Sequence, residues 1–298
     1  FVLGESVWGF QAALVASATV LVLLLRSYGA GERMIGTLSA IETAALILPQ
    51  AFGMYLFHSP RKRKRRLVLW HLLVILPFMH LMGATVLWGE TVMPRPAIPI
   101  LLILLFGCYS TGIGVVMAAW LDWMACLFPQ AQRGLATGLS FGGSACCATV
   151  GGLLAGWIIR HAAGTATYGG LYLAAGSLGM LAMLCFFAIR EPEPPLQESA
   201  PPSLGNLLRL FRHSLADRNF RDFLVGRTLA TAGFSVMPFV ALFFSSPSGG
   251  GLADGIIIAA ATAATATTAL CNLLLGHLGD RHGHRVGIIA GTCGQLLA

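Results

Sequence analysis

The ten residues GHLGDRHGHR, at positions 276–285, place one acid and two arginines between two strongly apolar runs. The carboxylate of Asp280 can accept hydrogen bonds from backbone N–H groups at the start of a neighbouring helix, where the macrodipole favours an anion. Arg281 and Arg285 can pair with carboxylates or with lipid phosphates. These residue types suit charged contacts that form and break between helix ends.

Among the acids within apolar runs, two are candidates for coupling or substrate binding, because a charged side chain costs about 2.5–3.5 kcal/mol at the centre of a membrane. Glu42 is eight residues inside the run 34–57, so we expect it roughly 12 Å deep. Burial favours a protonated carboxyl group, which is the property that a proton-coupling site requires. A structural glutamate that is only hydrogen-bonded is the alternative. Glu5, in the first run, is the second candidate.

Polar residues without charge could line a solute cavity. The candidates are Gln11, Gln50 and Asn272, with Thr262 and Thr265 in the same run as Asn272. Three charged residues closer to the run ends are expected to form an inner charge network: Asp122, Arg133 and Arg227. The histidines at 277, 282 and 284 are expected to be solvated, so neither a metal site nor a cofactor is predicted.

The surrounding sequence has the composition of a membrane protein. Of its 298 residues, 56% are hydrophobic and 10% are charged, whereas soluble domains are about a quarter charged. A helix needs about 20 apolar residues to cross the hydrocarbon core. The candidate runs are 4–26, 34–57, 67–89, 98–126, 134–160, 167–189, 221–245, 253–277 and 284–298. Their length favours helices over β-barrel strands, so we predict an all-α polytopic membrane protein.

Lysines and arginines fall mainly on one side of these runs, the side that carries RKRKRR at 61–66. Because cytoplasmic loops hold the excess of basic residues, we predict a multi-pass protein of the plasma (inner) membrane with a cytoplasmic N-terminus and a cytoplasmic central linker. The basic hexamer is a short loop between two runs. It is interpreted as a topology signal beside anionic lipid headgroups, so membrane lipid is an expected partner and nucleic acid is not.

The chain divides into three parts. Residues 1–190 hold six runs, and residues 191–206 (EPEPPLQESAPPSLGN) are rich in proline and acid, which predicts an extended linker. An interfacial amphipathic helix is predicted over 207–222. The linker and the main part of this helix are taken together as the middle part of the chain, 191–220. Residues 221–298 then begin a second group of helices.

The segment 276–285 resembles the G-x-L-x-D-R-x-G-R-R signature of the major facilitator superfamily, which that family carries between helices 8 and 9. The matching residues are Gly276, Leu278, Asp280, Arg281, Gly283, His284 and Arg285. The resemblance covers the whole chain and implies two pseudo-symmetric six-helix halves, the second truncated within helix 9. It also implies that this segment latches the outward-facing state. A turn without a dynamic role is the alternative.

The first half carries a degenerate copy of this signature. A shift of 223 residues places Gly53 on Gly276. Phe57 stands where the signature has aspartate, and Pro60 where it has glycine. The gate-loop candidates of the first half are Gly53, Arg61 and Lys62. A latch in this half would therefore rest on basic residues alone.

The resemblance implies secondary active or facilitative transport of a small solute, which binds between two halves and is exposed alternately to each side. No G-x-x-x-x-G-K-[ST] signature occurs, so the gradient of a proton, of another ion or of the solute itself would supply the energy. A non-transporting membrane sensor or assembly protein on the same fold is the alternative. No H-E-x-x-H motif occurs, and we do not expect an enzyme.

Overall fold

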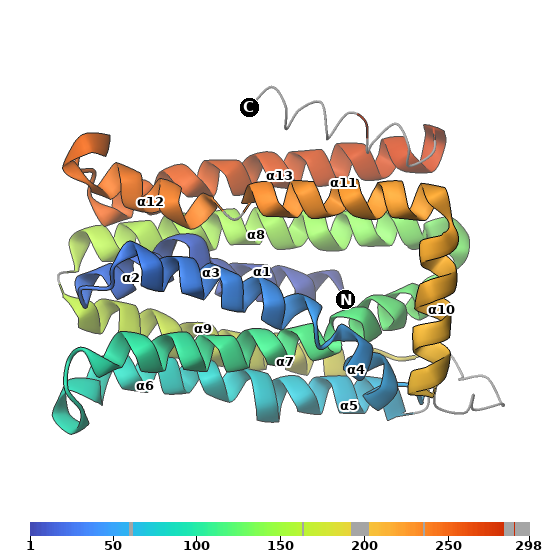
Figure 1. Cartoon of the computed structure of the whole chain (residues 1–298), viewed down its shortest axis with the longest axis horizontal. Coiled ribbons are helices and arrows are strands. Elements are labelled where there is room, and N and C mark those ends of the chain that lie inside the picture. The colour runs from blue at the N-terminus through green and yellow to red at the C-terminus, as the bar shows by residue number, and fades with distance from the viewer. Residues whose placement is uncertain (60–61, 163, 192–202, 235, 283–288, 290–298) are drawn as a thin grey trace.

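The computed structural model describes residues 1–59, 62–162, 164–191, 203–234, 236–282 and 289. These residues form helices that run mostly along the long axis of the molecule, with one helix lying across an end (Figure 1). Six of the described helices are long and apolar enough to cross a membrane. They span Val2–Ser27, Glu32–Leu56, Arg63–Val92, Ala97–Leu127, Arg133–His161 and Thr165–Phe187. The predicted all-α membrane protein is confirmed.

The first span is interrupted, although the run 4–26 predicted one continuous helix. Its elements are α1 (Val2–Leu14), the π-helical η1 (Ser17–Leu21) and α2 (Val22–Ser27). The break lies at Val15, with φ −131° and ψ 30°, and at Ala16, with ψ 126°. Neither glycine nor proline marks this position, so the sequence pattern did not predict the break.

The second and third spans also contain irregular turns. The second consists of α3 (Glu32–Ile47) and α4 (Gln50–Leu56), and the third of α5 (Arg63–Trp70), the π-helical η3 (His71–Ile75) and α6 (Leu76–Val92). The third span begins before the predicted start at 67, so Arg63 and Arg66 are helical and not part of a loop. Both donate hydrogen bonds to carbonyl groups at the end of α4, where a cation is favoured by the helix macrodipole.

The remaining spans are α7 (Ala97–Leu127), α8 (Arg133–His161) and α9 (Thr165–Phe187). In the first part of the chain, α1 packs on α8 and α9, α6 packs on α7 and α9, and α3 and α4 pack on α7. The largest buried cluster joins η1 and α2 to α6, α7 and α9.

The second part is formed by α10 (Leu204–Ala216), α11 (Arg218–Phe234), α12 (Met237–Ser245) and α13 (Asp254–His282). The helix predicted over 207–222 is present as α10, but it ends earlier than predicted, because Asp217 is extended, with ψ 122°. Its carboxylate accepts a hydrogen bond from the Phe220 backbone N–H at 3.2 Å. An aspartate in this position caps the next helix, so α10 ends and α11 begins here.

Two further boundaries differ from the prediction. The run 221–245 is divided between α11 and α12, and Pro238 lies in the first turn of α12, where a missing N–H group is tolerated. The run 253–277 is too short, because α13 continues to His282. The N-terminal part of the segment 276–285 is thus helical. Residues 283–285 lie outside the described residues, as does the run 284–298 apart from Ile289.

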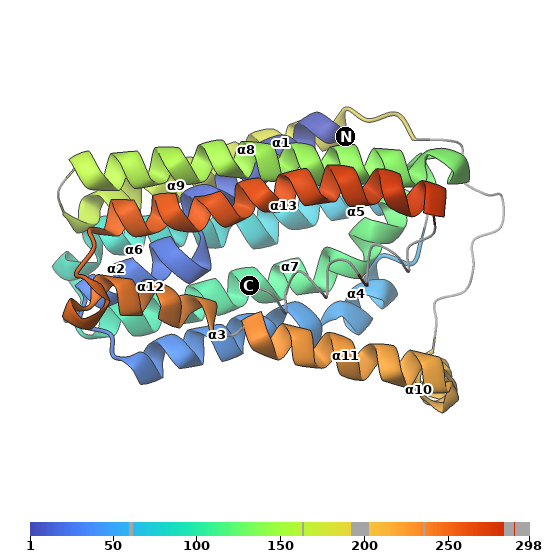
Figure 2. The same cartoon turned by 90° about the horizontal axis from the view of Figure 1, so that it is seen from above.

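The two ends of the bundle can be told apart by α10. We call the end that α10 crosses, where α4 and α9 terminate, the linker end, and the opposite end the far end (Figures 1 and 2). At the far end α12 contacts η1, α2 and α3, and the Tyr168 hydroxyl donates to Asp254 Oδ2 at 2.9 Å. α8 and α13 pack against each other. In α11 the described side chains from Arg218 to Leu229 are exposed.

A close approach of α4 and α7 depends on Gly53. A Cβ atom at this position would overlap the carbonyl oxygen of Val115 in the α7 backbone. We expect Gly53→Ala to lower the free energy of unfolding by about 1–3 kcal/mol, as overpacking does. The measurement is a denaturation curve of the purified protein. Gly170→Ala is the control, since its Cβ would have nothing within 4 Å, and an equal loss in both variants would contradict the packing argument.

Candidate functional site

A cavity of about 510 Å³ lies between the two parts of the chain; we call it the inter-part cavity. The first part contributes η1 and the residues beside the helix break, together with α8, and the second part contributes α12 and α13. Its lining includes Ala13, Ala16, Ala18, Thr19, Ala148, Gly152, Met237, Val240, Phe244, Ile258, Ala261, Thr262 and Thr265. None of the described lining residues is ionisable.

The hydroxyl groups of three threonines are the polar side-chain groups of this lining. Thr262 and Thr265 come from α13, as the sequence suggested, and Thr19 comes from η1. Thr262 Oγ1 donates to the Ile258 carbonyl of its own helix at 2.7 Å, and a threonine hydroxyl can still accept a second hydrogen bond. The cavity is therefore suited to an uncharged, mainly apolar molecule.

Glu42 is hydrogen-bonded to the segment that follows the break in the first span. Ser17 Oγ donates to Glu42 Oε1 at 2.8 Å, and Ser17 lies between Ala16 and Ala18, which both line the cavity. The pair is partly buried. The carboxyl group of Glu42, in α3, is thus hydrogen-bonded to η1, the segment whose residues Ala18 and Thr19 line the cavity.

A second set of polar groups lies behind Glu42 in the first part. Gln11 is fully buried. Its amide group makes no hydrogen bond of good geometry among the described residues, and the Tyr109 hydroxyl is the polar group that interacts with it. The hydroxyl group of Tyr172 is likewise buried and unpaired among them. Tyr109 lies within electrostatic range of Gln11 and Glu42. Buried polar atoms of this kind usually bind water, so α1, α3, α7 and α9 bring a hydratable cluster to Glu42.

Glu5 belongs to a different cluster, nearer the linker end. It is 6% exposed, and its Oε1 accepts a hydrogen bond from Trp120 Nε1 at 2.9 Å. The Trp120 ring packs edge-on against Phe186 at 4.7 Å and against His71 at 5.1 Å between centroids. Neither acid is among the described lining residues of the inter-part cavity, but Glu5 and Glu42 have different hydrogen-bond partners and occupy separate sites.

The basic residues after α4 bind main-chain oxygens. Arg63 donates to the Phe57 carbonyl at 3.2 Å and forms an ion pair with Asp122. Lys64 Nζ donates to the Ile189 carbonyl after α9 at 2.7 Å. Phe57, which replaces the aspartate of the signature, thus still offers an acceptor, but from its backbone.

Asp122 pairs with a different basic residue from those of the predicted inner charge network. Arg63 and not Arg133 pairs with this carboxylate, and Arg133 Nε donates to the Phe128 carbonyl at 3.2 Å. Trp123 Nε1 donates to Glu191 Oε1 at 2.7 Å and fixes the start of the linker. Lys62 is exposed.

The remaining predicted residues either do not line the inter-part cavity or have side chains that the structure does not describe. Gln50 Nε2 donates to the Leu46 carbonyl of its own span at 2.9 Å, and Gln50 does not line the inter-part cavity. Residues whose backbone lies in α11 or α13 but whose side chains are outside the description are Arg227, Asn272, Gly276, Leu278, Asp280 and Arg281. Residues wholly outside the description are Arg61, Gly283, His284 and Arg285.

Sequence reasoning missed Ser17, Thr19 and Tyr172 as neighbours of the candidate site. The one available signal was the run of small and hydroxylated residues ASAT at 16–19, which is unusual among the leucines and valines that surround it. Their roles depend on the helix break and on packing against distant spans.

One further motif has a structural explanation. GLSFG at 138–142 has the G-x-S-x-G spacing of a serine nucleophile, but a nucleophile elbow requires a strained turn between a strand and a helix. Ser140 instead lies within α8, fully buried, and its Oγ donates to the Ala136 carbonyl at 2.7 Å. It is an ordinary helix residue.

Comparison with known proteins agrees with this architecture. The family model of the Major Facilitator Superfamily matches residues 3–298. No curated protein matches the sequence. The family match confirms the resemblance drawn from the segment 276–285, and it also confirms the expectation that the protein is not an enzyme, since this family comprises membrane transporters of small-molecule solutes. With six described membrane-length helices and a match over nearly its full length, the chain belongs to the Major Facilitator Superfamily.

Proposed function

We propose that the protein carries an uncharged, mainly apolar small solute across the membrane by alternating access, and that the solute binds in the inter-part cavity. The observation that carries this proposal is the cavity itself, because helices of both parts line it and none of its described lining residues is ionisable. Transporters of this kind bind their solutes near the membrane midplane between two such parts.

We further propose that the linker end is cytoplasmic and that this arrangement is the inward-facing one. The excess of lysine and arginine on the linker side supports that orientation. Helices α12 and α13 join the first part at the far end through η1, α2, α3 and the Tyr168–Asp254 hydrogen bond. At the linker end, α11 leaves its described side chains exposed.

Glu42 is proposed as the coupling residue. Its carboxylate accepts a hydrogen bond from Ser17, whose chain neighbours Ala16 and Ala18 line the cavity. Gln11, Tyr109 and Tyr172 form a polar cluster near it. A solute in the cavity would contact η1, which carries Ser17, so solute binding and protonation of Glu42 would act on the same segment. Glu5, in its aromatic cluster, is proposed to have a structural role.

The segment around Asp280 is proposed to latch the outward-facing state. We expect Asp280→Asn to shift the population towards the inward-facing state and to raise the labelling rate of a cysteine placed at Leu229 of α11. Contacts of this kind couple conformations by about 1–3 kcal/mol, which corresponds to roughly fivefold or more in rate. The measurement is maleimide labelling from the cytoplasmic side of vesicles.

Tyr168→Phe is the matched control for this experiment, because it removes a contact at the far end. It should lower the same labelling rate. If both variants change the rate in the same direction, or if Asp280→Asn changes neither labelling nor uptake, the segment is a turn without a gating role.

The first test of the transport proposal is a thermal-shift screen of the protein in nanodiscs against neutral apolar, cationic and anionic solutes. We expect stabilisation by members of the neutral class only, followed by uptake of the same compounds into proteoliposomes. Stabilisation without uptake would favour a non-transporting sensor. Stabilisation by charged compounds alone would contradict the proposed solute class.

A further inference from the structure

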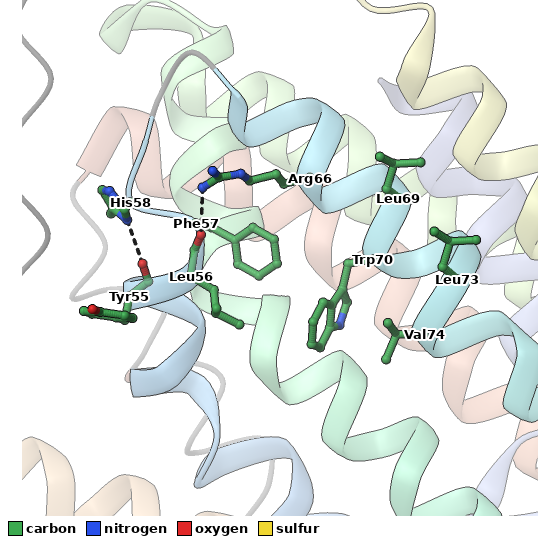
Figure 3. Close-up of a pocket in the computed structure, with 9 residues that line it drawn as sticks. All are labelled: Tyr55, Leu56, Phe57, His58, Arg66, Leu69, Trp70, Leu73 and Val74. Atoms are coloured by element: carbon green, nitrogen blue, oxygen red, sulfur yellow. Dashed lines mark hydrogen bonds between the residues drawn. The ribbon is translucent and has the colours of Figure 1, made fainter.

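A second cavity lies on the outer surface of the helix bundle, at the linker end. It is a groove of about 520 Å³ between the end of α4 and the start of the third span (Figure 3). Leu69 and Leu73 line it and are 38% and 71% exposed, and Val74 continues the same wall. The groove is separate from the inter-part cavity, and the transport proposal does not use it.

The mouth of the groove is basic. Arg66 Nη1 donates to the Leu56 carbonyl at 3.2 Å, and His58 Nδ1 donates to the Tyr55 carbonyl at 2.7 Å (Figure 3). The other guanidinium nitrogens of Arg66 and Nε2 of His58 have no partner among the described residues. Both side chains are therefore oriented by the end of α4. Arg66 keeps N–H groups available to an anion, whereas His58, whose Nδ1 already donates, can donate from Nε2 only as the imidazolium.

The apolar wall of the groove is already formed. Trp70 Nε1 donates to the Gly112 carbonyl of α7 at 3.1 Å. The Trp70 ring lies perpendicular to the ring of Phe57, with 6.0 Å between centroids. Because the indole is held by a hydrogen bond and by a ring contact, an occupant would not have to order this wall, and binding would cost less entropy.

We propose that this groove binds an anionic phospholipid of the surrounding membrane, with the phosphate at Arg66 and His58 and part of an acyl chain along Leu69, Leu73 and Val74. Charge complementarity supports this occupant, since the guanidinium of Arg66 lines the groove and pairs with no carboxylate among the described residues. The shape supports it as well, because the basic mouth lies at the end of a span and the apolar wall runs along the membrane-facing side of that span. A soluble peptide could not reach this wall without entering the lipid.

The test uses lipid-borne quenchers of tryptophan fluorescence. The full protein is reconstituted in phosphatidylcholine vesicles that contain a small fraction of either brominated phosphatidylglycerol or brominated phosphatidylcholine. We expect stronger quenching by the brominated phosphatidylglycerol, and we expect Trp70→Phe to remove most of that excess. One basic contact at a membrane surface corresponds to about fivefold in binding, so Arg66→Gln should lower the relative affinity for phosphatidylglycerol about fivefold.

Arg65→Gln is the matched control, because it removes the same charge from the neighbouring position, which does not line the groove. It should retain most of the preference. His58→Ala is a second groove variant and should also weaken the preference, which keeps the test decisive if Arg66→Gln does not fold. Equal quenching by the two lipids, or equal losses in Arg65→Gln and Arg66→Gln, would show diffuse attraction by the basic segment and would overturn the proposed site.

Discussion

Replacement of Glu42 by glutamine is expected to abolish proton-driven accumulation of the solute while leaving equilibration possible. With one proton coupled to each solute, a gradient of one pH unit is worth about 1.4 kcal/mol and sustains roughly a tenfold concentration ratio. Without a titratable group beside the cavity, the ratio should fall to about one. Glutamine keeps the size of the side chain and can still accept a hydrogen bond from Ser17, so the variant removes mainly the exchangeable proton.

The measurement is accumulation in proteoliposomes under an imposed pH gradient, with a solute identified by the thermal-shift screen. Glu90→Gln is the control, since this acid lies at the far end beside Arg95, at 3.6 Å, and is exposed. Glu5→Gln tests the other acid and should retain accumulation if its role is structural. Full accumulation by the Glu42→Gln protein would exclude this residue as the coupling site.

Filling the inter-part cavity is expected to have the second large effect. Ala148 of α8 lines the cavity, and Ala148→Trp would place an indole ring in the space proposed for the solute. A ligand present at 100 times its dissociation constant stabilises a protein by about 2.7 kcal/mol. We expect the variant to lose this stabilisation entirely, and transport with it.

The control for this variant is Ala174→Trp, which adds the same side chain at an exposed position of α9. It should keep both the solute-dependent shift in melting temperature and the transport activity. A persisting shift in Ala148→Trp would place the solute elsewhere. If both tryptophan variants lose the shift, the effect comes from destabilisation and not from occupation of the cavity.

The Glu42→Gln and Ala148→Trp predictions concern one transport mechanism, but each can be contradicted without the other. Glu42→Gln leaves the cavity volume unchanged, so it should retain the solute-dependent thermal shift. Ala148→Trp leaves the carboxyl group in place but removes the space for the solute. A protein that keeps binding in the first variant and loses it in the second would have distinct coupling and binding groups, joined through η1.

The sequence by itself determined the all-α class, the approximate positions of the six spans in the first part and the family. Span positions were predictable because a lipid bilayer demands about 20 consecutive apolar residues with every backbone group paired within its own helix. The family was predictable because the spacing of Gly276, Leu278, Asp280 and Arg281 is a local property of the chain. Two helix boundaries also have local sequence signals: Asp217 is a capping residue between α10 and α11, and Pro238 is a proline in the first turn of α12. The prediction missed both because it relied on the apolar runs.

Only the tertiary structure decided which residues meet. Ser17 and Glu42 are 25 positions apart, and Glu5 and Trp120 are 115 apart. In a soluble helix an apolar stripe reveals the buried face, but in a membrane the lipid-facing side is as apolar as the core. The faces that line the inter-part cavity, the lipid groove and the helix contacts therefore have similar sequences, and only packing distinguishes them. The helix break at Val15 and Ala16 is likewise a feature that only the tertiary structure decided, because no local residue requires it and the surrounding helices accommodate it.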